Sequence, residues 1–192
     1  MEINEEILNA VKNIFSQSDN SLLIGSGFVQ YHHVGNCDKP CNDCIDNDNR
    51  IFEVENQIKT PVHPFCDCYN SEVPTITAAE VSIIAYLQNP AIHLKLFGTL
   101  PDYYITKERA IQDFGWDRRR NTIAGKAPGM MIGGNVFANR DKVLPVKEGR
   151  IWYECDVDYT SGGRNSKRLF YSNDGLMFYS PDHGQKEFYL VI

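Results

Sequence analysis

Apolar and polar positions alternate with a helical period in three stretches of the chain. Residues 4–15 place their apolar side chains on one stripe, which is typical of an amphipathic helix. A threonine followed three residues later by a glutamate, a capping-box pattern, predicts a helix over residues 77–87 that the Asn-Pro pair at 89–90 ends. A third short helix is expected over residues 107–114, between a threonine and a glycine.

The C-terminal part of the chain changes to a strand pattern. β-Branched and aromatic residues gather in short runs separated by Ser-Gly-Gly, Asn-Asp-Gly and Pro-Asp-His-Gly turns. The predicted strands cover residues 151–157, 168–172, 176–179 and 187–192. Helices followed by a meander of strands predict the α+β class.

Turn-forming residues dominate two other stretches. Residues 35–50 are so rich in Asn, Asp, Gly and Pro that no regular structure is expected there, whereas residues 22–34 just before them are strand-like or extended. Residues 125–134 hold four glycines and a proline, which predict a tight, turn-rich loop. A metal or disulfides would have to organise the first of these stretches.

The length and hydropathy of the chain exclude a membrane-spanning protein. At 192 residues and 42% apolar residues it can bury an ordinary core. Its longest apolar runs, such as residues 81–87, are far shorter than the ~20 residues that cross a bilayer. Residues 1–15 carry three glutamates and lack the features of a signal peptide, so Sec-type export is not expected.

The net charge of −6 conceals two unlike halves. Residues 1–98 have 5 basic and 13 acidic residues, a net charge of −8, whereas residues 99–192 have 14 basic and 12 acidic residues, a net charge of +2. The local field rather than the total charge attracts a polyanion. An anionic partner is therefore expected on the C-terminal half only.

Five of the six cysteines lie within 32 residues of one another. A C-x-x-C pair followed by H-x-x-C-x-C gives the close ligand pairs that tetrahedral zinc requires. Disulfides and free thiols are the alternatives, and because the three states differ in cellular compartment they leave localisation open. The candidate metal ligands are Cys41, Cys44, His63, Cys66 and Cys68.

The strand region holds charged side chains where a purely structural sheet would have neutral ones. Cleavage of RNA by internal transesterification needs a base for the 2′-OH proton, an acid for the leaving 5′-oxygen and cations for the phosphorane. One carboxylate, one histidine and two or three basic residues meet that need without a metal. The candidates are Glu154, Arg164, Arg168 and His183, each of which alone is also typical of an ordinary surface residue.

From about residue 100 onward the chain resembles the barnase-type family of secreted bacterial ribonucleases, which prefer guanine. Five strings carry the resemblance in order: L-P-D-Y-Y-I-T-K from residue 100, I-G-G from 132, F-A-N-R from 137, Y-T-S-G-G-R-N-S-K-R from 159 and D-H from 182. The resemblance implies short helices packed on a twisted antiparallel β-sheet. It also implies metal-independent cleavage of single-stranded RNA 3′ of guanosine, through a 2′,3′-cyclic phosphate that is then hydrolysed.

The resemblance implies a role for each candidate. Glu154 would be the general base and His183 the general acid, and the two would exchange roles when the cyclic phosphate is hydrolysed. Asp156 matches a buried aspartate that holds the arginines in place. The cations that bind the scissile phosphate would be Lys107, Arg164 and Arg168.

The segment that reads the base differs from the family pattern. Asp141 stands where the family commonly has a glutamate, and Gly163 and Gly184 stand where aromatic residues are usual. Because stacking on an aromatic ring contributes ~1–3 kcal/mol per base, a weaker or broader base preference is expected. The residues that the resemblance assigns to base binding are Phe137, Asn139, Arg140 and Asp141.

The cysteine cluster with its H-P-F-C-D-C ending resembles the C-terminal end of phage Mu F-like (SPP1 gp7-type) minor head proteins over about 40 residues. This likeness implies an adaptor over residues 1–74, with a structural zinc ion, in front of a ribonuclease domain over residues 75–192. It also implies a toxin that a phage head or another non-Sec apparatus delivers.

Two functions remain open. The first is an endoribonuclease toxin that a barstar-like acidic inhibitor neutralises, because an active ribonuclease in the cytoplasm would harm its host. The second is a phage head or assembly protein whose C-terminal domain keeps the fold but only binds RNA or a partner. Cleavage of a short RNA in EDTA distinguishes them.

Overall fold

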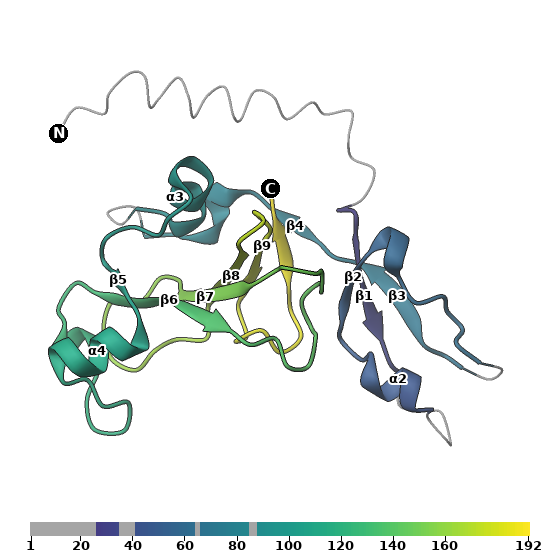
Figure 1. Ribbon diagram of the computed structural model, residues 1–192, viewed down its shortest axis with the longest axis horizontal. Coiled ribbons are helices and arrows are strands. Elements are labelled where there is room, and N and C mark those ends of the chain that lie inside the picture. The colour runs from purple at the N-terminus through teal and green to yellow at the C-terminus, as the bar shows by residue number, and fades with distance from the viewer. Residues whose placement is uncertain (1–25, 35–40, 64–65, 85–87) are drawn as a thin grey trace.

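The computed structural model describes residues 26–34, 41–63, 66–84 and 88–192. The helix predicted over residues 4–15, and Cys37 of the cysteine cluster, lie outside this part of the chain. Two sheets organise the described residues (Figure 1): a three-stranded sheet with the order β2-β1-β3 and a seven-stranded sheet with the order β4-β10-β9-β8-β7-β6-β5. No helix in the described ranges is long and apolar enough to cross a membrane.

The larger sheet is an antiparallel meander with a short parallel strand at each edge. Antiparallel pairing links β6 through β10 in chain order, and β4 and β5 each pair in parallel with a neighbour. All four C-terminal strands predicted from the sequence are present, and the α+β class is confirmed. The strands are β4 (Thr75–Ile76), β5 (Tyr104–Ile105), β6 (Met131–Phe137), β7 (Trp152–Asp156), β8 (Arg168–Ser172), β9 (Met177–Ser180) and β10 (Tyr189–Val191).

The helix predicted over residues 77–87 is wrong in the part that the structure describes, residues 77–84. The capping box of Thr77 and Glu80 is present, but it opens only the 3-10 turn η2 (Ala78–Val81), after which Ser82 is extended. The Asn-Pro pair starts a helix instead of ending one. In α3 (Pro90–Phe97) the Asn89 side chain accepts hydrogen bonds from the backbone N–H groups of Ala91 and Ile92. Proline is tolerated there because its missing N–H has no partner in the first turn.

Two other helices follow α3. Helix α4 (Lys107–Phe114) has the predicted bounds, with the Thr106 side chain accepting from the N–H of Arg109 at its start. Helix α5 (Ile123–Lys126) falls at the start of the stretch predicted to be a loop. The loop prediction is also wrong at the end of that stretch, because β6 begins at Met131. Gly133 sits in this strand since a Cβ there would lie 2.5 Å from the Tyr104 ring and 2.7 Å from Cys155.

The smaller sheet is built from the cysteine-rich segment. Within residues 35–50, where no regular structure was expected, the described part holds a one-turn helix, and the extended stretch before it contains a strand. The elements are β1 (Phe28–His32), α2 (Asn42–Asp46), β2 (Ile51–Glu53), the 3-10 turn η1 (Val54–Asn56) and β3 (Tyr69–Glu72).

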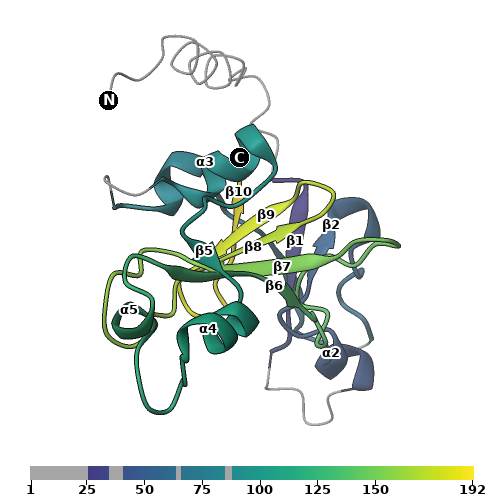
Figure 2. The ribbon, with the colours of Figure 1, turned by 60° about the vertical axis from the view of Figure 1, so that its left-hand side comes forward.

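The two faces of the large sheet have different covers. Helix α3 and η2 pack on one face, whereas α4 and α5 lie together at the β5–β6 end (Figure 2). On the other face, Trp152, Phe170 and Phe178 form a core that also includes Ile51 and Val73 of the small sheet and its neighbour segment. The two sheets therefore share one hydrophobic core.

Candidate active site

Strands β7 and β8 carry three of the predicted site residues on one face of the large sheet. Glu154 and Asp156 are two residues apart on β7, so their side chains leave the same face. Arg168 lies directly opposite Asp156 in the antiparallel register of β8. The pleat of two central strands thus fixes the positions of a carboxylate pair and a guanidinium without any loop.

Asp156 contacts both arginines. Its carboxylate is fully buried and accepts hydrogen bonds from Arg164, Nε to Oδ2 at 2.7 Å and Nη2 to Oδ1 at 2.6 Å. The Nε of Arg168, a side chain only 1% exposed, forms an ion pair with Oδ1 at 3.2 Å. Burial lowers the pKa of Arg164, but the hydrogen bonds to Asp156 together with the negative charges of Asp156 and Glu154 outweigh it, and the net effect raises that pKa. One carboxylate between two guanidinium groups leaves one positive charge uncompensated.

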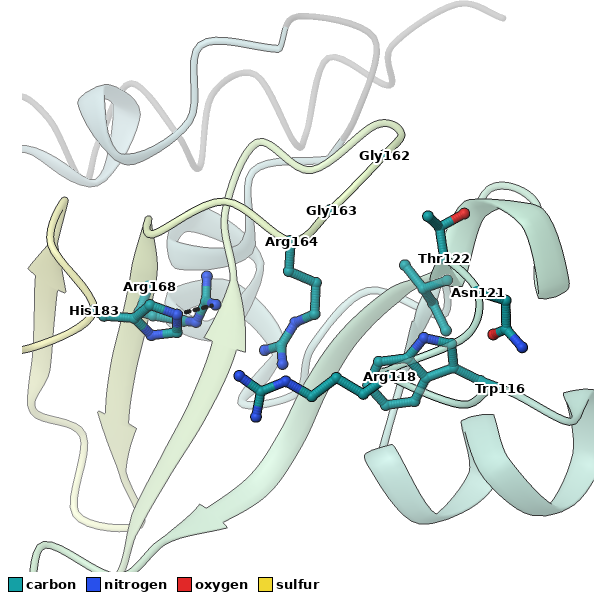
Figure 3. Close-up of a pocket in the computed structure, with 10 residues that line it drawn as sticks. Trp116, Arg118, Asn121, Thr122, Gly162, Gly163, Arg164, Arg168 and His183 are labelled. Carbon is teal, nitrogen blue, oxygen red and sulfur yellow. Dashed lines mark hydrogen bonds between the residues drawn. The ribbon is translucent and has the colours of Figure 1, made fainter.

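His183 is attached to the same cluster through Arg168. Nη2 of Arg168 lies 3.0 Å from Nε2 of His183 (Figure 3). A guanidinium only donates, so Nε2 is the acceptor and the imidazole is neutral in this geometry. Burial, followed by the charges of Arg168 and Arg164, lowers the pKa of His183. The backbone of His183 is left-handed, with φ +73°, and its N–H donates to the carbonyl of Ser166 at 2.8 Å.

Glu154 is paired with the predicted phosphate-binding lysine. Nζ of Lys107 lies 2.5 Å from Oε1 of Glu154, and both side chains retain solvent exposure, 42% and 17%. Lys107 is the first residue of α4, and its backbone N–H donates to Asn135 Oδ1 at 3.0 Å. Asn135 is the cross-strand neighbour of Glu154, so the start of α4 is held against the carboxylate.

A cavity of about 170 Å³ lies over the arginine pair and is lined by Arg164, Arg168 and His183. Arg118, from the loop after α4, also lines it and extends toward Arg164 (Figure 3). A neighbouring groove of about 580 Å³ connects Lys107, Arg118 and Arg164. The cations that the sequence predicted therefore line two neighbouring cavities that share Arg118 and Arg164, and Glu154 is connected to the second through its ion pair with Lys107.

The predicted base-binding residues lie at the end of β6. Asn139 has φ +44° and closes its loop: its side chain donates to the carbonyl of Leu144 at 2.9 Å and accepts from the N–H of Leu144 at 3.1 Å. Arg140 and Asp141 are exposed on this loop, and a cavity of about 450 Å³ adjoins it. The ring of Phe137 packs against Phe170 at a centroid distance of 4.8 Å. These residues form a site separate from the arginine pair.

Known proteins are similar in sequence to the C-terminal half of this chain. A model of the ribonuclease family matches residues 93–191. The ribonuclease of Heyndrickxia coagulans is 43% identical over 102 residues, which are 53% of this chain and 93% of that protein. The ribonucleases of Bacillus intermedius and Bacillus pumilus are 43% identical over 103 residues, 54% of this chain and 63% of theirs. The chain belongs to the ribonuclease family.

The matched region spans just under two thirds of the length of the two Bacillus ribonucleases. It contains every residue that the resemblance assigned to catalysis or base binding in this chain. The small sheet and the cysteine cluster lie outside it.

Some residues at or beside this candidate site were missed from the sequence. Arg118 lines both depressions over the arginine pair, with Trp116 beside it. The run of three arginines at 118–120 was the signal that would have pointed to it. Phe170 had no such signal, because it reads as an ordinary apolar strand residue. It lies between Phe137 and Gly184, where a Cβ would approach its Cζ to 2.7 Å.

The candidate metal ligands come together in the small sheet, away from the arginine pair. Cys41, Cys44 and His63 form one group of close ligand atoms, and Cys44 forms another with Cys66 and Cys68. All described cysteines are free thiols. The cluster contains the two cysteines of the C-x-x-C motif and the histidine and two cysteines of the H-x-x-C-x-C motif.

Proposed function

We propose that this protein is an endoribonuclease that cleaves single-stranded RNA by transesterification to a 2′,3′-cyclic phosphate, followed by hydrolysis of that ester. One observation carries the proposal. Glu154 and His183, a carboxylate and an imidazole, both interact electrostatically with the Arg164–Arg168 pair that a single buried aspartate holds. An acid and the excess positive charge thus line one cavity, and the base lies near it through its ion pair with Lys107.

In the first step, Glu154 accepts the proton of the 2′-OH as that oxygen attacks phosphorus. The bond from phosphorus to the 5′-oxygen breaks, and protonated His183 gives its proton to the departing oxygen. In the second step the roles reverse: His183 takes a proton from water, and Glu154 returns one to the 2′-oxygen. The reaction needs the 2′-OH of the substrate itself, so RNA is cleaved and DNA is not.

The cations stabilise the charge that develops on the phosphorane. Arg164 and Arg168 are pre-positioned by Asp156, which avoids reorganisation during the reaction. The anionic phosphate also draws the Arg168 guanidinium away from Nε2 of His183, which raises the affinity of that nitrogen for the proton it has to donate. Lys107 lies between Glu154 and the groove, where it contacts the same phosphate. This chemistry involves no metal ion.

Arg118 extends the binding path beyond the scissile phosphate. Its guanidinium lines the cavity together with Arg164, and none of the described side chains forms an ion pair with it, whereas its neighbour Arg120 pairs with Asp117. An unpaired guanidinium facing an anion site is available for a second phosphate of the RNA chain.

The base preference is guanine, with weaker discrimination than an aromatic-rich site would give. Backbone amides of the Asn139–Asp141 loop and the Asp141 carboxylate contact the base edge. At residue 184 the Phe170 ring fills the space of a stacking side chain, and Gly163 has none to offer. Loss of these platforms removes ~1–3 kcal/mol of stacking each.

The biological role that fits these features is a toxin of two parts. Residues 1–74 form the adaptor, resembling a phage head fragment, and residues 75–192 form the ribonuclease domain; β3 ends at Glu72 and β4 joins the large sheet at Thr75. A non-Sec route, such as a phage-like particle, delivers the protein, or an inhibitor holds it in the cytoplasm. The cationic depression is complementary to an acidic, barstar-like inhibitor.

Cleavage of a short RNA in the presence of EDTA tests the enzymatic proposal. We expect products that end in a cyclic phosphate and at least ~10²-fold less cleavage by Glu154→Gln and His183→Ala, with Glu148→Gln, on an exposed loop, as the matched control. Intact RNA bound by the wild-type protein would instead support a non-catalytic head or RNA-binding protein. Titration with the product of the adjacent gene tests the inhibitor, and undiminished activity at excess would reject it.

A further inference from the structure

The thiols and the imidazole of the small sheet form one compact cluster. Sγ of Cys44 is 3.3 Å from Sγ of Cys41, 3.7 Å from Sγ of Cys66 and 3.6 Å from Nε2 of His63. Cys68 completes a set with Cys44 and Cys66 in which all sulfur atoms lie within 4.8 Å of one another. Cys41 and His63 form a second such set with Cys44, so the five side chains gather around the Cys44 thiol, which both sets share.

These separations are those between neighbouring ligands of one tetrahedral metal ion. With Zn–S bonds of about 2.3 Å and Zn–N bonds of about 2.0–2.1 Å, two sulfur ligands lie about 3.8 Å apart and a sulfur and a nitrogen about 3.6 Å apart. A disulfide requires two sulfur atoms at about 2.05 Å. The cluster therefore has the spacing of metal ligands and not that of a disulfide.

Ile51 and Phe28 of the small sheet pack into the core of the large sheet, but the side of the small sheet that holds the cysteines has few apolar residues. Its buried core consists of Tyr31 and three of the cysteines, with only a few partly buried apolar residues around them. A core of this size does not by itself offset the entropy of ordering the segment, which is why small modules commonly contain a metal. Binding of an ion to the cluster would supply the missing free energy.

We propose that this cluster is a structural zinc site that also fixes the base-binding loop of the ribonuclease. Cys41, Cys44 and Cys66 are three of the ligands, and His63 or Cys68 is the fourth. Four protein ligands leave no position for a substrate, so the role of the ion is to stabilise the small sheet and the segments in contact with it.

Strand β2 connects the cysteine cluster to the base-binding loop. It is an edge strand of the small sheet and follows Cys41 and Cys44 in the chain. The outward N–H of Ile51 donates to the carbonyl of Val143 at 2.7 Å, and Nε of Arg50 donates to the carbonyl of Lys142 at 3.3 Å. Lys142 and Val143 directly follow Asp141. The edge of the small sheet is thus hydrogen-bonded to the loop that the proposed function assigns to base recognition, and the meaning of this contact for catalysis depends on that assignment.

A second contact reaches the segment that carries the general acid. The Gln30 side chain on β1 donates to the carbonyl of Lys186 at 3.3 Å, three residues after His183. Gln30 is itself buried and donates to the carbonyl of Asn49 at 3.1 Å, next to β2. The zinc-held sheet therefore supports two loops of the ribonuclease site from one side.

The metal is tested first on the full chain, purified under reducing conditions. We expect one zinc ion per chain in the wild type and in Cys155→Ala, whose thiol lies in the large sheet, and loss of the ion in Cys44→Ser. Comparison of His63→Ala with Cys68→Ser identifies the fourth ligand. Replacement of zinc by Co²⁺ in the wild type should give the absorption of tetrahedral thiolate ligation, which keeps the test valid if a variant does not fold. A metal-free, folded wild type would overturn the proposal.

The connection to the loop is tested by hydrogen exchange on the wild type with and without a chelator. Once the zinc is removed, the amides of Ile51 and of residues 139–144 should exchange about tenfold faster or more, while those of β8 remain protected. Unchanged exchange at Ile51 and in the loop, with the metal demonstrably gone, would overturn the connection. Neither measurement uses RNA, so both results stand apart from whether the protein cleaves it.

Discussion

Nη2 of Arg168 donates to Nε2 of His183 at 3.0 Å, on the nitrogen that has to carry a proton for catalysis. Burial and the charges of Arg168 and Arg164 lower the pKa of His183. Transesterification needs this group protonated, so activity is present below that pKa and lost as the pH rises through it. We predict that the falling limb of kcat/KM against pH lies below the ordinary histidine value of about 6.5.

The charge of Arg164 supplies part of that shift. Arg164→Gln should reduce the rate and also move the falling limb to higher pH, whereas Arg119→Gln, on the exposed run, should leave the limb in place. An NMR titration of the His183 ring in the free protein provides an independent value. A limb at or above the ordinary histidine value in the wild type would contradict this account of the site.

Asp156 is predicted to be essential for stability as well as for activity. Asp156→Asn leaves Arg168, 1% exposed, without its compensating charge, which should lower the free energy of unfolding by ~3–5 kcal/mol. The matched control is Asp113→Asn, which removes an exposed pair with Arg109 and should change stability by ~0–0.5 kcal/mol. Denaturant unfolding measures both, and equal effects would show that Asp156 is not a buried ionic anchor.

Phe170 and residue 184 are predicted to be coupled. Gly184 has φ +74°, and a Cβ there would lie 2.7 Å from Cζ of Phe170, so Gly184→Ala should destabilise the protein by roughly 2–4 kcal/mol. Gly175→Ala, at φ +94° with nothing within 4 Å, has only the backbone strain of roughly 1–2 kcal/mol.

A double-mutant cycle isolates the clash itself. In a Phe170→Leu background, Gly184→Ala should destabilise less than it does in the wild type, because the smaller side chain leaves room for the methyl group. If the two substitutions were simply additive, the ring would not be the reason for glycine at this position.

Arg118 is predicted to bind a phosphate of RNA outside the scissile position. In a His183→Ala background that prevents cleavage, Arg118→Ala should weaken binding of a short RNA and reduce the slope of log affinity against log salt by about 0.7, one single-strand phosphate contact. Arg119 lines neither of these two cavities, so Arg119→Ala should change the slope less. Equal slopes for Arg118→Ala and its parent would assign this arginine to the surface.

Sequence patterns predicted the C-terminal strands well because short runs of β-branched and aromatic residues lie between clear turn signals. Strand β8 is buried on both faces, and the sequence predicted its bounds correctly. The Asn-Pro pair at 89–90 misled the prediction, since the same residues stop one helix or start another, and packing of α3 on the sheet decides between them. The glycines of β6 likewise read as a loop because the close approach of Tyr104 and Cys155 is not visible in the sequence.

The chemistry of the site was predictable from the order of short motifs, but its surroundings were not. The family strings contain Lys107, Arg164, Arg168 and His183, whereas Glu154 was assigned from the resemblance position by position. Glu154 and Arg168 lie on strands with a regular register, and Arg164 and His183 lie on the segments that follow strands. The contact of Ile51 with Val143 depends on how the small sheet packs on the large one, and that of Phe170 with residue 184 depends on how the turn after β9 folds back on β8. Local sequence patterns do not predict such contacts between distant segments.

Cleavage of two matched oligonucleotides tests the assignment of Glu154 and His183 most directly. One is a short RNA with a single guanosine, and the other is identical except for a 2′-deoxyguanosine at that position. Our account predicts that the wild type cuts the first to a cyclic phosphate in EDTA and leaves the second intact, and that Glu154→Gln and His183→Ala lose at least ~10²-fold of this activity. Equal cutting of both oligonucleotides, or full activity in either variant, would contradict it.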